Sequence, residues 1–162
     1  MSVEASNESS GHDFDFWMGR WRGHNRRLRE RLAGCDQWDE FEGICVARPI
    51  LDGLGNVEDF RTDYQGGIVG MSLRLFDPVT RLWAIYWSDS RRSGILEPPV
   101  VGSFSNGIGV FDCDDTFDGR PIVVRYRWSD ITTTTARWEQ SFSDDGGESW
   151  ETNWTVEHSR VD

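Results

Sequence analysis

The sequence predicts an all-β protein built from antiparallel strands. Turn-forming residues recur about every ten residues, which is the spacing of a β meander, a sandwich or a barrel. The segments between them are short and rich in aromatic and β-branched side chains, and no helical periodicity extends beyond two turns. The turn signals are Asp52-Gly53 to Gly55-Asn56, Gly66-Gly67, Asp77-Pro78, Ser105-Asn106-Gly107, Asp118-Gly119 and Asp145-Gly146-Gly147.

We expect about eight to ten strands between these turns. Residues 11–18, before the first strand, are predicted to form a single helical turn. Residues 27–32 have the best helical spacing elsewhere, and the same spacing fits the end of a strand. The predicted strands are 17–32, 36–48, 57–65, 67–76, 81–88, 100–111, 121–129, 134–143 and 149–160.

Apolar and polar side chains alternate along the last three predicted strands, so each strand has one buried face. This inner face is aromatic, and it is either a packed core or the wall of a pocket. Its polar members are Tyr126, Gln140, Thr152 and His158. The whole predicted inner face is Ile122, Val124, Tyr126, Trp128, Ala136, Trp138, Gln140, Phe142, Trp150, Thr152, Trp154, Val156 and His158.

The register of strands 67–76 and 81–88 depends on the loop between them, at residues 77–80. A slip of one residue would turn the other face of each strand inward. Tyr86 and Trp87 are therefore both candidates for the pocket, although alternation allows only one of them to face it. The two alternative inner sets are Trp83, Ile85 and Trp87, or Leu82, Ala84 and Tyr86.

The charge balance excludes the electrostatic footprint of a nucleic-acid-binding protein. The chain has 17 basic residues, all of them arginine, against 28 acidic residues, which gives a net charge of −11. We therefore expect no nucleic-acid partner and no binding to anionic membranes. Nine Trp and nine Phe residues in a chain of 162 instead favour strands and an aromatic pocket.

Length and hydropathy predict one domain, residues 13–162, after a flexible N-terminal segment, residues 1–12. No apolar run approaches the ~20 residues that a membrane-spanning helix needs, and the first residues lack the pattern of a signal peptide. A cytoplasmic location is expected. Cys35, Cys45 and Cys113 have no CxxC spacing, so we expect reduced thiols and no metal site.

Residues 143–150, Ser-Asp-Asp-Gly-Gly-Glu-Ser-Trp, resemble the Asp-box hairpin of sialidases and many other β proteins. In that hairpin an Asp accepts hydrogen bonds from the turn backbone, a Gly supplies positive φ and the Trp packs under the turn. We expect a structural pin between the last two strands. Glycoside hydrolysis would need two carboxylates across a cleft, and the sequence places no such pair.

Gly19-Arg20-Trp21 precedes the first long strand, and Arg160 lies near the end of the last one. This resembles the Gly-x-Trp and C-terminal Arg pair of the calycin superfamily, in which the first and last strands are neighbours. There the arginine stacks on the tryptophan at the closed end of the barrel.

Residues 14–21, 51–56, 73–78, 83–87 and 137–140 together resemble a bacterial lipocalin-like family whose chemistry is unassigned. The likeness spans about residues 13–160. It implies an all-β, antiparallel, up-and-down lipocalin-like (calycin) barrel with a central cavity, and it transfers no catalytic residue.

The run from Gly19 to Gly23 is also similar to the Gly-x-Trp-x-Gly opening of the nitrobindins, which are haem-binding barrels. Their iron ligand is a histidine near the end of the chain, a position that His158 matches. The glycine run of that family ends at Gly23 here. We therefore expect no resident cofactor and keep haem as the less favoured alternative.

The remaining chemical signals are weak. Asp112, Asp114, Asp115 and Asp118 match no calcium-loop spacing and are predicted to form a solvated turn. No Gly-x-Ser-x-Gly motif is present. Glu139 is expected to face Arg125 or Arg127 on the outer surface.

Three functional hypotheses remain open. The first is a small-molecule binding protein that holds a largely apolar or aromatic ligand in the barrel; the second is a cofactor-free isomerase, cyclase or lyase that uses the same cavity. In the third, the barrel is packed shut and its exterior binds another protein. A homodimer is compatible with each of these hypotheses. The candidate ligand-binding residues are Tyr86, Trp87, Tyr126, Trp138, Gln140, Trp154 and His158, and no catalytic residue is assigned.

Overall fold

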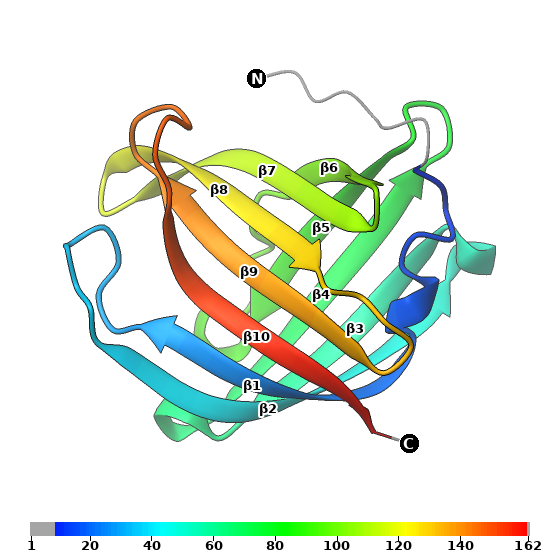
Figure 1. Ribbon diagram of the computed structural model, residues 1–162, viewed down its shortest axis with the longest axis horizontal. Helices are drawn as coiled ribbons and strands as arrows, with labels where there is room; N and C mark the ends of the chain where they lie inside the picture. The colour runs from blue at the N-terminus through cyan, green and yellow to red at the C-terminus, as the bar shows by residue number, and fades with distance from the viewer. Residues whose placement is uncertain (1–8, 162) are drawn as a thin grey trace.

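The computed structural model describes residues 9–161, which form a closed antiparallel barrel of ten strands (Figure 1). Each strand pairs with its neighbours in the chain, and β1 also pairs with β10. The predicted all-β class is therefore confirmed. The strands are β1 (Gly19–Leu28), β2 (Trp38–Ile50), β3 (Gly55–Thr62), β4 (Ile68–Asp77), β5 (Leu82–Asp89), β6 (Val100–Ser105), β7 (Ile108–Phe117), β8 (Arg120–Ser129), β9 (Thr135–Ser143) and β10 (Glu151–Val161).

Four short 3-10 helices connect or precede strands: η1 (Asp15–Trp17), η2 (Leu51–Gly53), η3 (Tyr64–Gly66) and η4 (Ser90–Arg92). No helix in residues 9–161 has the length and apolar character needed to cross a membrane. The predicted helical turn before the first strand is η1. Of the N-terminal segment predicted to be flexible, residues 1–8 lie outside the described part of the chain. Ser9 is buried, and its hydroxyl donates a hydrogen bond to Asp13.

One predicted strand, 100–111, is in fact two, because Asn106 and Gly107 have positive φ and form the turn that separates β6 from β7.

The acidic residues after this point do not form the predicted turn, because β7 continues through Asp112, Asp114 and Asp115 to Phe117. Of the four aspartates only Asp118 lies in a turn, where its φ is positive. Asp112 faces Arg125 across the ladder and accepts two hydrogen bonds from it, so the strand neutralises this carboxylate.

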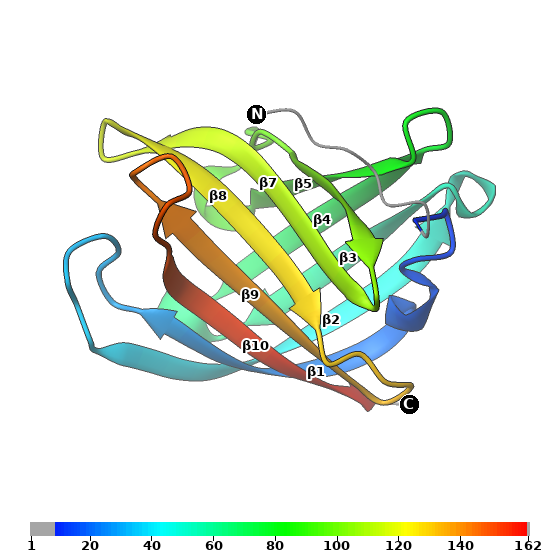
Figure 2. The same cartoon turned by 45° about the horizontal axis from the view of Figure 1, so that its top comes forward.

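Aromatic side chains plug one end of the barrel, the end near η1 in Figures 1 and 2. Phe14, Trp17 and Trp21 are almost completely buried, and the rings of Trp17 and Trp21 stack with centroids 4.8 Å apart. The Trp21 indole donates a hydrogen bond to the Trp17 carbonyl. Burying rings of this size supplies a large part of the hydrophobic stabilisation and closes this end to solvent.

Arg160 covers the plug as the calycin resemblance implies. Its guanidinium carbon lies 4.3 Å from the centre of the Trp21 ring, and the two residues face each other across the β1–β10 ladder. The guanidinium also donates hydrogen bonds to the carbonyls of Met18, Phe16 and Thr133. One side chain therefore joins the segment before β1, the loop before β9 and the last strand.

The Asp-box hairpin pins β9 to β10 as predicted. The Asp145 carboxylate accepts hydrogen bonds from the Ser143 hydroxyl and from the backbone and hydroxyl of Ser149. The hydrogen bonds from Ser149, with that from Ser143, lower the pKa of Asp145 to about 2. Gly146 and Gly147 have positive φ, and the Trp150 indole donates to the Gly147 carbonyl.

A β-bulge in β10 overturns part of the predicted inner face. Thr152 pairs with Ser141 and Trp154 with Gln140, so Asn153 is an extra residue in the ladder. One inserted residue reverses the facing of everything before it. Thr152 and Trp150 are therefore outside, where the Trp150 ring lies 4.1 Å from the guanidinium carbon of Arg125.

We expect Arg160→Met to lower the free energy of unfolding by about 2–4 kcal/mol, since it removes a cation–π contact and three charged hydrogen bonds. The matched control is Arg26→Met, which removes an exposed stacking contact on the Trp38 ring and a long contact with Glu40, and should cost about 1 kcal/mol or less. Urea unfolding of both variants measures the difference. Equal losses would contradict a special role for Arg160.

Candidate functional site

A cavity of about 590 Å³ occupies the barrel between the aromatic plug and the opposite, open end. Its lining includes six of the seven residues that the sequence nominated: Trp87, Tyr126, Trp138, Gln140, Trp154 and His158. The seventh, Tyr86, does not line it. Side-chain alternation along the strands therefore predicts most of this wall correctly.

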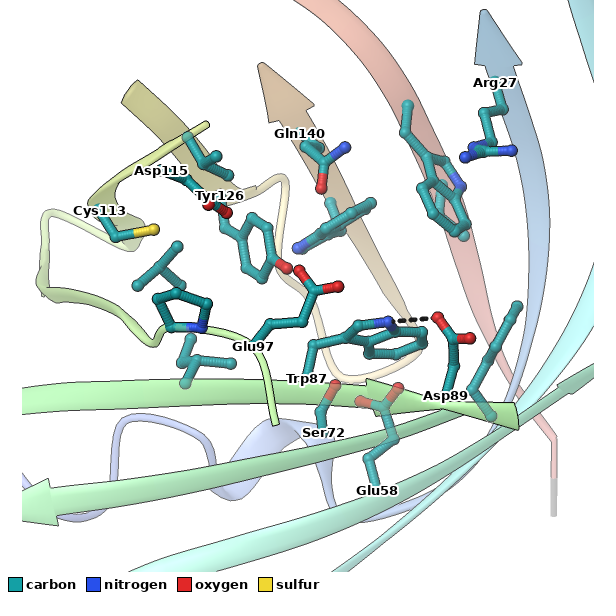
Figure 3. Close-up of a pocket in the computed structure, with 18 of the residues that line it drawn as sticks. Arg27, Glu58, Ser72, Trp87, Asp89, Glu97, Cys113, Asp115, Tyr126 and Gln140 are labelled. Carbon is teal, nitrogen blue, oxygen red and sulfur yellow. Dashed lines mark hydrogen bonds between the residues drawn. The ribbon is translucent and has the colours of Figure 1, made fainter. Parts of the chain in front are cut away.

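The register of β5 explains the exclusion of Tyr86. Ile85 and Trp87 both line the cavity, so the intervening Tyr86 points to the other face of the strand. Gly70 on β4 makes room for Trp87: a Cβ atom there would lie 2.2 Å from the indole ring. The Trp87 indole donates a hydrogen bond to Asp89, as Figure 3 shows.

Three rings on neighbouring strands form an aromatic wall. Tyr126 on β8 meets Trp138 on β9 edge to face with centroids 5.1 Å apart, and Trp138 meets Trp154 on β10 in the same way at 5.7 Å. Gln140 lies beside them and donates to the side chain of the bulge residue Asn153. The wall offers ring faces and edges to a ligand and few polar groups.

A buried ion pair lies in the cavity wall on β3 and β4. Arg74 donates to Glu58 over 2.7 Å, and both side chains are less than a tenth exposed. Arg74 also donates to Asn56, and the Trp17 indole donates to Glu58. Burial alone would raise the pKa of Glu58, but the charge and hydrogen bond of Arg74 and the bond from Trp17 outweigh it and lower that pKa.

Sequence reasoning missed this pair. A charged residue in an apolar strand is usually assigned to the outer face, because a lone buried charge is costly. The usable signal was the two-residue alternation of side chains along each strand. Glu58 is two residues before Phe60, and Arg74 is two residues after Ser72, so each shares the inner face of its strand. Two opposite charges on inner positions of adjacent strands indicate an internal pair.

His158 lies deep in the cavity in its neutral form. Its side chain is 6% exposed, and Nδ1 has no hydrogen-bond partner in the described chain. Gly23 is opposite, where a Cβ atom would come 3.1 Å from Nδ1. Burial, aided by the charge of Arg74 and opposed by Glu58, lowers the pKa of His158 to about 4.

The imidazole of His158 is packed among indole rings. Its ring centroid lies 4.6 Å from Trp17, 5.8 Å from Trp128 and 6.4 Å from Trp21. Within residues 9–161, no group of three His, Cys, Asp or Glu side chains that could hold a metal ion is found.

The other candidate reactive groups either face the outer surface of the barrel or stay protonated. Glu139 faces Arg127 across the outer ladder and forms ion pairs with Arg127 and Arg137, as the sequence predicted. Cys45 and Cys113 both line the cavity. Burial raises the pKa of Cys45 well above its ordinary value, and burial with nearby aspartates raises that of Cys113 to about 12, so both thiols stay protonated.

Arginines surround the open end of the cavity. Arg91 binds Asp89 through two guanidinium nitrogens, and Arg92 binds Glu97 over 2.8 Å. Arg27, at the end of β1, and Arg31, in the loop after it, also line the cavity. Figure 3 shows Arg27 on the side of the pocket away from Asp115.

The acid sensitivity of folding tests the state of His158. The unfolded chain binds a proton at this residue near pH 6.5, whereas the folded chain does so only near pH 4. Over this interval the unfolded state holds more protons, so stability falls as the pH drops, by about 3 kcal/mol in total. In His158→Gln that loss should be absent from urea unfolding curves recorded across the interval.

His24→Gln is the control. His24 is on the outer face, where the hydrogen bonds that it donates to Glu42 and Glu40 raise its pKa. The stability that His24 contributes is fully present below the pKa of this residue in the unfolded chain. It is lost only as the pH rises through the higher pKa that His24 has in the folded chain. The slope between about pH 4 and pH 6.5 should therefore survive in His24→Gln. Persistence of the full slope in His158→Gln would refute the buried neutral imidazole.

Comparison with known proteins supports the fold alone. No family model matches the chain, and no curated protein matches it significantly. Among solved structures, it is similar to the S-type phycobiliprotein lyase from Guillardia theta, with a TM-score of 0.63 and 14% sequence identity. The match covers 96% of this chain and 94% of the other, so the likeness extends over the whole barrel.

Proposed function

We propose that this protein binds a small, largely apolar, ring-containing molecule inside its barrel. The cavity of about 590 Å³, lined by the wall of Tyr126, Trp138 and Trp154, carries this proposal. That volume lies within the roughly 300–1,000 Å³ typical of small-molecule sites. A core packed shut would contain only voids near the size of a water molecule.

The polar groups of the cavity are few and suited to orienting a ligand. Burial raises the pKa of Tyr126, so its hydroxyl stays protonated and can donate a hydrogen bond. The neutral imidazole of His158 can donate one hydrogen bond and accept another. Together with Gln140 they would select among ring systems by the position of polar substituents.

A cofactor-free isomerase, cyclase or lyase is the second candidate. The observation that favours it is His158, because its neutral imidazole, buried deep in the cavity, is available as a proton acceptor at neutral pH. The similar barrel from Guillardia theta is named as a lyase, which supports this candidate. Such a reaction would use the wall to hold its substrate in a reactive shape.

Binding of the neutral dye N-phenyl-naphthylamine, followed by its fluorescence, tests the first proposal. We expect one dye molecule per chain. Trp138→Ala should weaken the affinity roughly tenfold, because the central ring of the wall and its contacts are lost. Trp150→Ala, on the outer face of the same hairpin, should leave the affinity within about twofold. Absence of binding, or equal effects of the two variants, would rule out a ligand site at this wall.

Native mass spectrometry of the freshly purified protein tests the enzymatic candidate, because it gives the mass of any molecule that the barrel carries. That molecule is added back to ligand-free protein, and its conversion is followed by chromatography. An enzyme would convert it, and His158→Gln would slow the conversion by roughly 10²–10⁴ while affinity changes little. A molecule that binds and returns unchanged would leave binding as the function. An adduct of haem mass with a Soret band would overturn both candidates.

A further inference from the structure

The cavity has the opposite charge balance to the rest of the protein. The whole chain has a net charge of −11. The residues that line the cavity nevertheless include five arginines, at positions 27, 31, 74, 91 and 92, against four carboxylates, at 58, 89, 97 and 115. His158 adds no charge at neutral pH. An excess of positive charge within so acidic a protein needs a local explanation.

Three of these arginines are neutralised by their neighbours. Arg74 pairs with Glu58, Arg91 with Asp89 and Arg92 with Glu97, so three of the four carboxylates are engaged. The fourth, Asp115, accepts a hydrogen bond from the backbone of Thr116. Its side chain lies across the pocket from Arg27 in Figure 3.

Arg27 and Arg31 have no ion-pair partner within residues 9–161, and Nε of Arg27 is buried with no hydrogen-bond partner. Tyr64 and Asp39 both interact with Arg27, but the Asp39 carboxylate is already bonded to Arg29 and to the Tyr64 hydroxyl. Burial and the positive charges of Arg27 and Arg91 outweigh the negative charges of Asp118 and Glu97 and lower the pKa of Arg31 to about 10, which still leaves it protonated at neutral pH. Two partly desolvated cations therefore repel each other at one site, an arrangement that an anion would relieve.

Aromatic rings hold both guanidinium groups in place. The carbon of the Arg27 guanidinium lies 5.1 Å from the Trp154 ring centre, and that of Arg31 lies 4.9 Å from Phe117 and 5.5 Å from Phe142. Stacking occupies the flat face of a guanidinium and leaves N–H groups at its edge. Those edges suit two-point hydrogen bonding to the oxygens of a carboxylate, sulfonate or phosphate.

We infer that Arg27 and Arg31 bind an oxyanion at one end of the ligand, so that the natural ligand is an amphipathic anion with an apolar ring body. The inference rests on the proposed binding function and narrows its ligand class. Trp154 lies under Arg27 and also belongs to the aromatic wall, so one continuous surface serves both the ring body and its anionic end. The ring body of the ligand lies against the aromatic wall, and its anionic group stays at the open end of the cavity.

Two dyes with the same ring body test this directly. Anilinonaphthalene sulfonate is anionic, and N-phenyl-naphthylamine is its neutral counterpart. Fluorescence titration should show that the sulfonate binds roughly ten times more tightly than the amine. Arg27→Gln and Arg31→Gln should each weaken sulfonate binding roughly tenfold, because a charged hydrogen bond is lost. Both should leave amine binding within about twofold, which also shows that the barrel is folded.

Arg26→Gln is the matched control. It removes the same charge from the neighbouring position of β1, but Arg26 faces outward, over the Trp38 ring and beside Glu40, and does not line the cavity. Sulfonate affinity should stay within about twofold in this variant. Equal binding of both dyes, or equal effects of all three variants, would overturn the oxyanion site while leaving the proposed binding function intact. Failure of both dyes to bind the unmodified protein would overturn the binding function itself and the oxyanion site with it.

Discussion

The pairing of β1 with β10 is the constraint on which the rest of the structure depends. Once these strands pair, the sheet has no edge, and every strand directs alternate side chains into one interior. A barrel of about eight strands is narrow enough for side chains to fill it, whereas ten strands leave room inside. The plug of Phe14, Trp17 and Trp21 uses that room at one end, and Arg160 fastens the plug to the last strand. The remaining space is the cavity, and it can open only at the other end.

The buried ion pair of Glu58 and Arg74 matters more for its local effects than for its contribution to the stability of the protein. Removing Glu58 and Arg74 from water costs about as much as their attraction returns, so a buried pair is a weak source of stability. Its geometry has clear consequences nonetheless. Glu58 holds the indole of Trp17 within the plug, and the charge of Arg74 helps to keep His158 neutral. The deep part of the cavity is therefore polar but uncharged overall, next to a wall of rings.

Much of this arrangement follows from side-chain alternation, and its failures have identifiable physical causes. Period two along β8 and β9 places Tyr126, Trp138 and Gln140 correctly on the inner face. The same rule fails for Trp150, because the extra residue at Asn153 inverts the strand and no local sequence feature marks the bulge. Tyr86 and Trp87 cannot be separated by alternation, since register there depends on tertiary pairing. Arg27 and Arg31 escape sequence reasoning for another reason: the role proposed for them rests on the absence of an ion-pair partner among residues 9–161, which only the folded arrangement reveals.

The contrast between a negative exterior and a positive cavity constrains which ligands can bind. At physiological salt the field of the surface extends only about 8 Å, but within that range it opposes the approach of anions. A small polyanion would be repelled and, once inside, would find few polar partners beyond the two arginines. A molecule with a large apolar body gains most of its affinity from the wall and needs only one charge to fix its direction. The separation of roles also suits the scaffold, because the strands fix the positions of the rings while Arg31 reaches the cavity from the loop after β1 and is held there by Phe117 and Phe142.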